Sequence, residues 1–296
     1  MNEKKLVIPE GSELKEIEEK THRAKERIRE DMSSIPVIIK RNDEMIRHPD
    51  DILESSIKEG LEQFKRSKYS LFLSAIAAGL ILGFAAMSVA IVTVITKDFS
   101  PLTRRLMTAF VYPLGFLVCI MSRTQLFTEH TARAVYPFLD TKVKLKEVFY
   151  VWAVVLAGNL LGTLISSYLI TGADSVISAK LGYLYIAEHL ISYSNSEVFV
   201  SAILAGWLMA QGGWLIASTS QAFAQISCIF VVTFLIGIGG LHHSIAGSAE
   251  VFTGLIFSEN PQIFESLRFL TFAVIGNLVG GSIFVAILNY GHIKKT

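Results

Sequence analysis

Long uncharged runs dominate the chain after residue 68 and predict membrane-spanning helices. Residues 69–96 contain no Asp, Glu, Lys or Arg, and neither do residues 198–241. About 20 consecutive apolar residues in a helix cross the hydrocarbon core of a bilayer. The first run therefore provides one span and the second provides two, with the small polar stretch at residues 218–221 as the turn between them.

Three further apolar runs bring the expected number of spans to six. Span three covers residues 148–170, and span six covers residues 269–288. Span two starts after Arg105 but meets charged residues again soon after residue 122, so it looks interrupted rather than finished. The sequence therefore predicts an all-α membrane protein with six transmembrane helices.

The end of span five carries chemistry that is unusual in a bilayer. Residues 237–257 place His242, His243 and Glu250 in an apolar run whose glycines break the helical periodicity. Irregular backbone and ionisable side chains are costly at membrane depth unless they are buried in protein or line a watery cavity, and they commonly mark a transport pathway. We expect a broken helix with a transport site in this stretch.

Composition and charge divide the chain into a polar segment and a membrane domain. Hydrophobic residues make up 51% of the sequence and the mean hydropathy is +0.48, which excludes an ordinary soluble protein. More than half of the charged residues lie in residues 1–68, where apolar residues at three- and four-residue spacing predict an amphipathic helix on the cytoplasmic face. That stripe comprises Leu14, Ile17, Thr21, Ala24, Ile28 and Met32, and a second short helix is expected from Ile52, Ile57, Leu61 and Phe64.

Basic residues predict the orientation in the membrane. Those between spans two and three, and those at the end of the chain, fall on the same side as the charged N-terminal segment: Lys142, Lys144, Lys146, Lys294 and Lys295. The positive-inside rule then places both termini in the cytoplasm, although Arg104 and Arg105 in the expected outer loop weaken this assignment. The expected organisation is a cytoplasmic segment 1–68, a channel domain 69–290 and a cytoplasmic tail 291–296 in an inner or plasma membrane protein.

Two short sequence motifs each occur twice in the chain, in the same order. QLFTEHT at residues 125–131 precedes GNLLG, and EVFTGLI at residues 250–256 precedes GNLVGG. Each repeat holds three spans, so the second copy enters the membrane inverted relative to the first. Inverted repeats place the functional site near the midplane, where two broken helices meet. Chance similarity between short apolar words is the alternative.

Several words together resemble the formate/nitrite transporter family over residues 69–290. They are YPLGFLVCIMSRTQLFT in span two, GNLLG in span three, AEHL and AILAGWLMAQGGWL around span four, GGLHHSIAGSAEVF in span five and GNLVGG in span six. The chain is also similar to a divergent branch of that family with an arginine just before its Gln-Leu-Phe-Thr word.

The resemblance implies a homopentamer with one six-helix, aquaporin-like pore per subunit, built from two inverted three-helix repeats in which helices two and five are broken. Such a pore passes small monovalent anions or their conjugate weak acids, with no cofactor, metal or nucleic acid. By motif, His243 is the central histidine and Thr128 the threonine that faces it. The implied constriction residues are Tyr112, Phe116, Leu126 and Phe127.

Two departures from the family leave the substrate open. Leu190 stands where the family has a lysine after its Ala-Glu-His word, and Gly206 stands where it has an asparagine in span four. Arg123 and Glu250 replace small or different residues of formate channels. Since Gln125 is the expected repeat mate of Glu250, inverted symmetry could bring Arg123 and Glu250 together as a bracing salt bridge, or Arg123 could attract the anion in place of the lysine.

The physical problem for such a pore is that a bare carboxylate loses several kcal/mol or more of hydration in an apolar constriction. A proton from solvent or from His243 would let the acid pass as a neutral molecule, so transport could be coupled to protons. Two other functions remain open: a closed scaffold that conducts nothing, and an intramembrane metalloenzyme using His242, His243 and Glu250.

Overall fold

The computed structural model describes residues 47–294, and every regular element in that range is helical. Six of the described helical segments are long and apolar enough to span a membrane, which confirms the expected number. They are α4 (Lys68–Ile95), α5 and α6 (Pro101–Val111 and Pro113–Met121), α9 (Leu145–Gly172), α12 (Asn195–Ala217), α13 (Ala222–Gly239), and α15 (Ile263–Gly281) continued by η1 (Ser282–Ile287) and α16 (Leu288–Ile293). The protein is therefore a multi-pass membrane protein, and its described part is all-helical.

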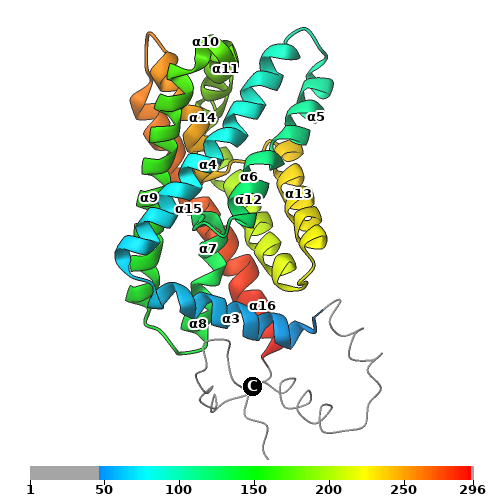
Figure 1. Ribbon diagram of the computed structural model, residues 1–296, viewed down its shortest axis with the longest axis vertical. Helices are drawn as coiled ribbons and strands as arrows, with labels where there is room; N and C mark the ends of the chain where they lie inside the picture. The colour runs from blue at the N-terminus through cyan, green and yellow to red at the C-terminus, as the bar shows by residue number, and fades with distance from the viewer. Residues whose placement is uncertain (1–46, 295–296) are drawn as a thin grey trace, which may run out of the picture.

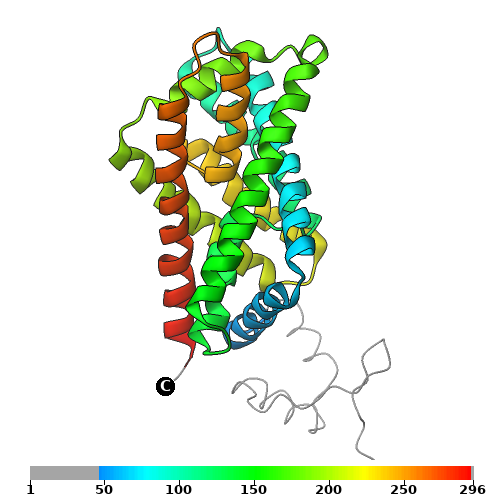
Figure 2. The same cartoon turned by 90° about the vertical axis from the view of Figure 1, so that its left-hand side faces the viewer.

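Two opposite ends of the bundle carry short helices and define its faces (Figures 1 and 2). At one end lie α3 (Pro49–Lys65) and α8 (Val135–Leu139), and we call this the α3 face. At the other end lie α10 (Asp174–Ile177) and α11 (Lys180–Ile191), which mark the α11 face. The described chain starts and ends at the α3 face.

Helix α3 confirms the second short helix expected from the sequence, and it is tied to the membrane helices. The guanidinium of Arg133 lies 3.6 Å from the carboxylate of Glu59. A Cβ at Gly60 would overlap the carbonyl oxygen of Arg133 and lie 2.7 Å from Cγ of Pro137, so the two backbones approach closely. The amphipathic stripe at residues 14–32 lies outside the described residues.

One helix boundary differs from the sequence expectation. Helix α5 begins at Pro101, so Arg104 and Arg105 belong to the helix instead of to a loop. Ser100 caps this helix by accepting from the Thr103 N–H, and Arg105 Nε donates to the carbonyl of Ile238 at 2.6 Å. Between α9 and α12 the chain forms α10 and α11, and α11 packs against α14. The boundary of α5 differs because charged side chains near a helix end do not interrupt the helix.

Small residues bring two pairs of helices into backbone contact. Helix α4 crosses α9, and α12 crosses α15. A Cβ at Gly79 would overlap the carbonyl oxygen of Asn159, and a Cβ at Gly206 would overlap that of Asn277. Interfaces of this kind in membranes rely on small residues because lipid provides no hydrophobic driving force between helices. These crossings set the positions of the two asparagines used below.

Candidate functional site

Two short non-helical segments interrupt the bundle near its middle. Helix α6 stops at Met121 and the chain becomes helical again in α7 (Phe127–Arg133). Helix α13 stops at Gly239 and α14 (Ser244–Phe257) follows. Left-handed backbone marks both breaks, with φ of 54° at Arg123 and 60° at Gly240. Glycine adopts this conformation without a steric penalty, so Gly240 suits its position. Arg123 adopts the same conformation although its Cβ makes it less favourable.

Two buried asparagines hold these segments through the same set of hydrogen bonds. Asn159 Oδ1 accepts from the Phe127 N–H at 2.8 Å, and its Nδ2 donates to the carbonyls of Ala75 and Gln125. Asn277 Oδ1 likewise accepts from the Ser244 N–H at 2.8 Å, and its Nδ2 donates to the carbonyls of Ala202 and His242. Each amide therefore joins one interrupted segment to two helices and satisfies backbone groups that lipid cannot satisfy.

Where the two segments meet, the side chains of His243 and Thr128 are in contact. His243 is the N-cap of α14, and its Nδ1 accepts from the Ala246 N–H at 3.1 Å. A backbone N–H can only donate, so these partners place the proton of the neutral imidazole on Nε2. Nε2 lies 2.8 Å from the Thr128 hydroxyl oxygen, to which it donates. The sequence prediction that these two residues face each other agrees with this geometry.

Aromatic rings enclose the histidine on one side. The Phe116 ring meets the His243 ring edge to face, with centroids 5.0 Å apart, and the Tyr112 ring lies 5.0 Å from that of Phe116. Leu126 and Phe127 are also buried, at the start of α7. The structure therefore brings Tyr112, Phe116 and His243 into one chain of contacts that ends at Thr128.

Two further expected pathway residues lie on α11 and α12. Leu190 is half-buried in the last turn of α11 and packs on apolar residues near Phe269. Gly206 is at the crossing of α12 with α15, where any side chain would overlap the backbone of Asn277. An asparagine at residue 206 would fit there only if the two helices separated, and the role of Gly206 in the pathway stays a prediction.

Arg123 and Glu250 do not form the expected pair. Within residues 47–294 no ion pair joins them. Arg123 lies between α6 and α7 and lines a cavity toward the α3 face. Glu250 is buried in α14, which packs against α9 and α11. The expected contact assumed that Gln125 is the repeat mate of Glu250, whereas the asparagine hydrogen bonds match Gln125 with His242.

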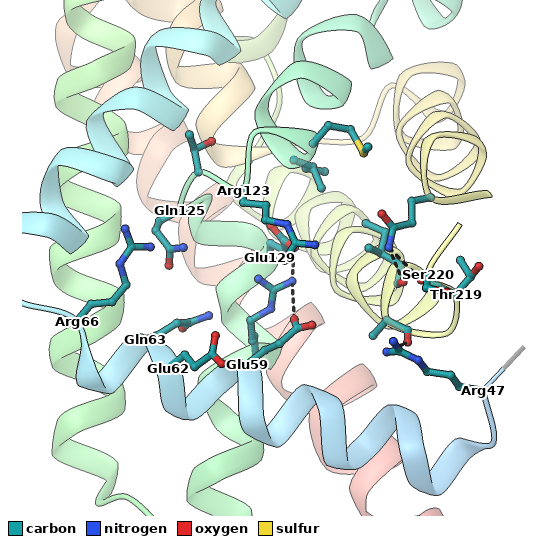
Figure 3. A pocket seen from close by; sticks show the side chains of 17 residues that line it. Arg47, Glu59, Glu62, Gln63, Arg66, Arg123, Gln125, Glu129, Thr219 and Ser220 are labelled. Atoms are coloured by element: carbon teal, nitrogen blue, oxygen red, sulfur yellow. Dashed lines mark hydrogen bonds and ion pairs between the residues drawn. The ribbon is translucent and has the colours of Figure 1, made fainter. Parts of the chain in front are cut away.

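The cavity beside Arg123 has a volume of about 500 Å³ and is strongly polar (Figure 3). On one wall of the cavity, the Arg133 guanidinium makes an ion pair with the buried Glu129. The same guanidinium also lies near Glu59. The other charged lining residues of the cavity are Arg47, Glu62, Arg66 and Arg123, and its amide-bearing ones are Gln63, Gln125 and Gln225. Four arginines against three glutamates leave a cationic excess at this end of the site.

The described part of the chain offers no metal centre. Among residues 47–294, no group of three or more His, Cys, Asp or Glu side chains is arranged to hold an ion. His242 and Glu250, proposed above as ligands together with His243, do not gather around a common point. The arrangement can donate hydrogen bonds, exclude water and attract anions, which are the properties of a permeation path.

Comparisons with known proteins agree with this chemistry. The family model described as "Formate/nitrite transporter" matches residues 50–291. The chain belongs to the formate/nitrite transporter family. Among curated relatives, the inner membrane protein YfdC of Escherichia coli (strain K12) is 29% identical over 242 residues, covering 80% of this chain and 76% of the relative. The family consists of transporters and channels rather than enzymes, and the resemblance expected from the motifs is confirmed.

Solved structures show the same fold. An "FNT family ion channel" superposes with a TM-score of 0.74 at 16% identity, covering 83% of this chain and 99% of that one. A "pentameric formate channel with formate bound" superposes with a TM-score of 0.66 at 20% identity, covering 77% and 98%.

Proposed function

We propose that this protein passes small monovalent anions, or their conjugate weak acids, through a path centred on His243 and Thr128. The observation that carries the proposal is the buried Nε2 to hydroxyl contact of 2.8 Å at the meeting point of two interrupted helices. Family membership supports the class of solute, and one structural relative is a channel with formate bound. The remaining pathway residues that we propose are Tyr112, Phe116, Leu126 and Phe127, with Leu190 at the α11 face.

The architecture that we propose is a pair of inverted three-span repeats. The matching hydrogen bonds of Asn159 and Asn277 support it, as do the matching crossings at Gly79 and Gly206. We further propose a homopentamer, since a structural relative is described as pentameric. The α3 face is assigned to the cytoplasm of an inner or plasma membrane because Lys142, Lys144 and Lys146 follow α8 there.

The chemistry of permeation follows from burial and hydrogen bonding. An anion that leaves water for the apolar surroundings of Phe116 or Phe127 loses hydration worth several kcal/mol or more. A proton on the anion removes most of that cost, and the Nε2–H of His243 is a donor placed at the centre of the path. We propose that the solute takes a proton from solvent or from His243 and crosses as the neutral acid.

At the α3 face, Arg123 is proposed to attract the anion into the cavity of about 500 Å³. It takes the role that the family gives to the lysine replaced by Leu190, but at the opposite end of the path. Arg133 is less suited to this role because Glu129 and Glu59 already neutralise it.

The test of the proposed function is His243→Asn in liposomes loaded with a pH indicator. Asparagine is a favoured N-cap and can still accept from the Ala246 N–H, so the fold should survive while the titratable ring is lost. We expect formate or nitrite flux in the wild type and an altered pH dependence between about pH 5 and 8 in the variant. The control is His292→Asn, which removes an exposed histidine at the α3 face.

Three outcomes are informative. Equal flux in the wild type and His243→Asn at every pH would remove the histidine from the mechanism. No flux of formate, nitrite, acetate or chloride through the folded wild type would leave the closed scaffold as the better function. Flux that responds equally to His292→Asn would show that the effect does not belong to the central site.

A further inference from the structure

The side chain of His242 is buried without a hydrogen-bond partner. It is 3% exposed, and neither of its ring nitrogens has a hydrogen-bond partner. Its backbone is fixed on both sides, because its N–H donates to Ser201 Oγ at 3.1 Å and its carbonyl accepts from Asn277 Nδ2 at 3.0 Å. The ring therefore cannot reach solvent through a small shift of the main chain.

Aromatic neighbours do not satisfy this ring. The Tyr193 ring lies edge to face at 5.0 Å and the Phe269 ring at 5.6 Å. Edge-to-face contacts stabilise a ring, but they do not replace the hydrogen bonds of a buried imidazole, whose donor and acceptor both lose water. A native protein retains such a group where another molecule completes its hydrogen bonds or where it has a functional role.

Tyr193 covers His242 and is itself linked to solvent. It lies in the connection between α11 and α12, so its side chain can move without breaking a helix. Its hydroxyl is 3.1 Å from Nε2 of His189, which is exposed at the α11 face. A line of contacts therefore runs from the exposed His189 through Tyr193 to His242, which is the chain neighbour of His243.

The charged side chains near these contacts already have hydrogen-bond or ion-pair partners. The Glu197 carboxylate accepts from the Ser194 N–H at 2.8 Å and from its hydroxyl at 2.6 Å. Arg268 donates to the carbonyls of Ile191 and Tyr193 and pairs with Glu265. Imidazole and phenol groups are therefore the donors that remain for a solute.

We propose that His242, with Tyr193 as a movable cover and His189 at the entrance, forms a second binding site at the α11 face that holds one small weak acid or its anion before it reaches His243. The inference rests on the proposed function for the class of solute. The imidazole N–H of His242 supplies a donor to a carboxylate oxygen, and the Tyr193 hydroxyl supplies another once it leaves His189.

The first experiment measures formate uptake from the α11 face in vesicles of one orientation. His242→Phe keeps a ring of similar size between Tyr193 and Phe269 but removes both nitrogens. We expect the apparent KM for external formate to rise about tenfold or more, as for the loss of a hydrogen bond to a charged group, while the maximal rate changes little. Tyr185→Phe is the control, because it removes a hydroxyl from the same face and keeps the ring that stacks on His189.

The second experiment reads the site without transport. His242 is the only histidine in the sequence that follows a leucine, so labelling leucine at the carbonyl carbon and histidine with ¹³C and ¹⁵N identifies the amide of His242 by NMR in the wild-type protein. Through-bond correlations from that amide then assign its imidazole signals. Sodium formate should shift the imidazole signals of His242 in a saturable way, and sodium sulfate should not.

Each result decides a different claim. Wild-type flux with an unchanged KM in His242→Phe overturns the second site and leaves the proposed function standing. Absence of flux in the wild type overturns the proposed function, and the NMR titration then decides the site alone. Imidazole signals of His242 that ignore formate overturn the site even if His242→Phe does not fold.

Discussion

Replacing Asn277 with leucine should destabilise the protein and disturb the central site together. The side chain is fully buried and makes three hydrogen bonds of 2.8 to 3.0 Å. Leucine has a similar volume but leaves the Ser244 N–H and the His242 carbonyl without the amide that they bond. A buried backbone group without a partner costs about 1–3 kcal/mol, so the two together give about 2–6 kcal/mol.

The functional consequence follows from the position of the lost bonds. Both orphaned groups flank His243, the residue whose Nε2 contacts Thr128. Release of the segment should lengthen that contact and reduce flux even at temperatures where the variant remains folded.

Thermal unfolding in mild detergent and flux in liposomes measure the two effects separately. A loss of about 2–6 kcal/mol corresponds to a Tm lowered by roughly 3–10 °C in a protein of this size. Asn260→Leu is the matched control, since that side chain is exposed in the connection between α14 and α15. An Asn277→Leu protein with the Tm and flux of the control would refute the claim that this amide fixes the segment.

Three other predictions concern packing, pH and the polar segment. Gly206→Asn, which introduces the family residue, should prevent close contact between α12 and α15 and abolish folded protein in size-exclusion chromatography. Partial burial raises the pKa of Asp140, but the ammonium groups of Lys142 and Lys294 outweigh it and hold that pKa below its usual value. This stabilisation is present above the ordinary carboxyl pKa of about 4 and is lost as the pH falls through the lowered value, so Asp140→Asn should show a smaller acid-induced fall in Tm. Deletion of residues 1–46 should leave assembly intact, whereas deletion through residue 65 should lower the Tm because it removes α3 and its contact with Arg133.

Sequence patterns were sufficient for the spans and for the central contact. Uncharged length identifies a membrane helix because lipid excludes unpaired charge, and this rule does not depend on tertiary structure. The contact of Thr128 with His243 was accessible through family motifs, since neither residue predicts its partner alone. The glycine words in spans three and six were also informative, because only small residues permit the close crossings observed there.

The register of the proposed repeat could not be obtained from matching residue types. The Phe-Thr word at residues 127–128 begins α7, whereas the one at residues 252–253 lies well inside α14. Equivalent positions are indicated instead by hydrogen bonds of main-chain groups. The Phe127 N–H donates to Asn159 and the Ser244 N–H donates to Asn277, so Phe127 corresponds to Ser244. Hydrogen bonds of backbone groups cannot be recognised from residue types. The expected pairing of Arg123 with Glu250 therefore rested on a different register from the one that these hydrogen bonds indicate.

The hydrogen bonds of Asn159 and Asn277 also bear on the speed of the proposed transport. They fix the main chain on both sides of the central contact, so the two interrupted segments cannot swing as units to expose the path to one compartment at a time. Rotation of rings such as Phe116 and Tyr193 is then the motion left to admit a solute, and side-chain rotations are far faster than the rearrangement of helices. We therefore expect the turnover of a selective channel with a low activation enthalpy, and not the slow cycle of an alternating-access carrier.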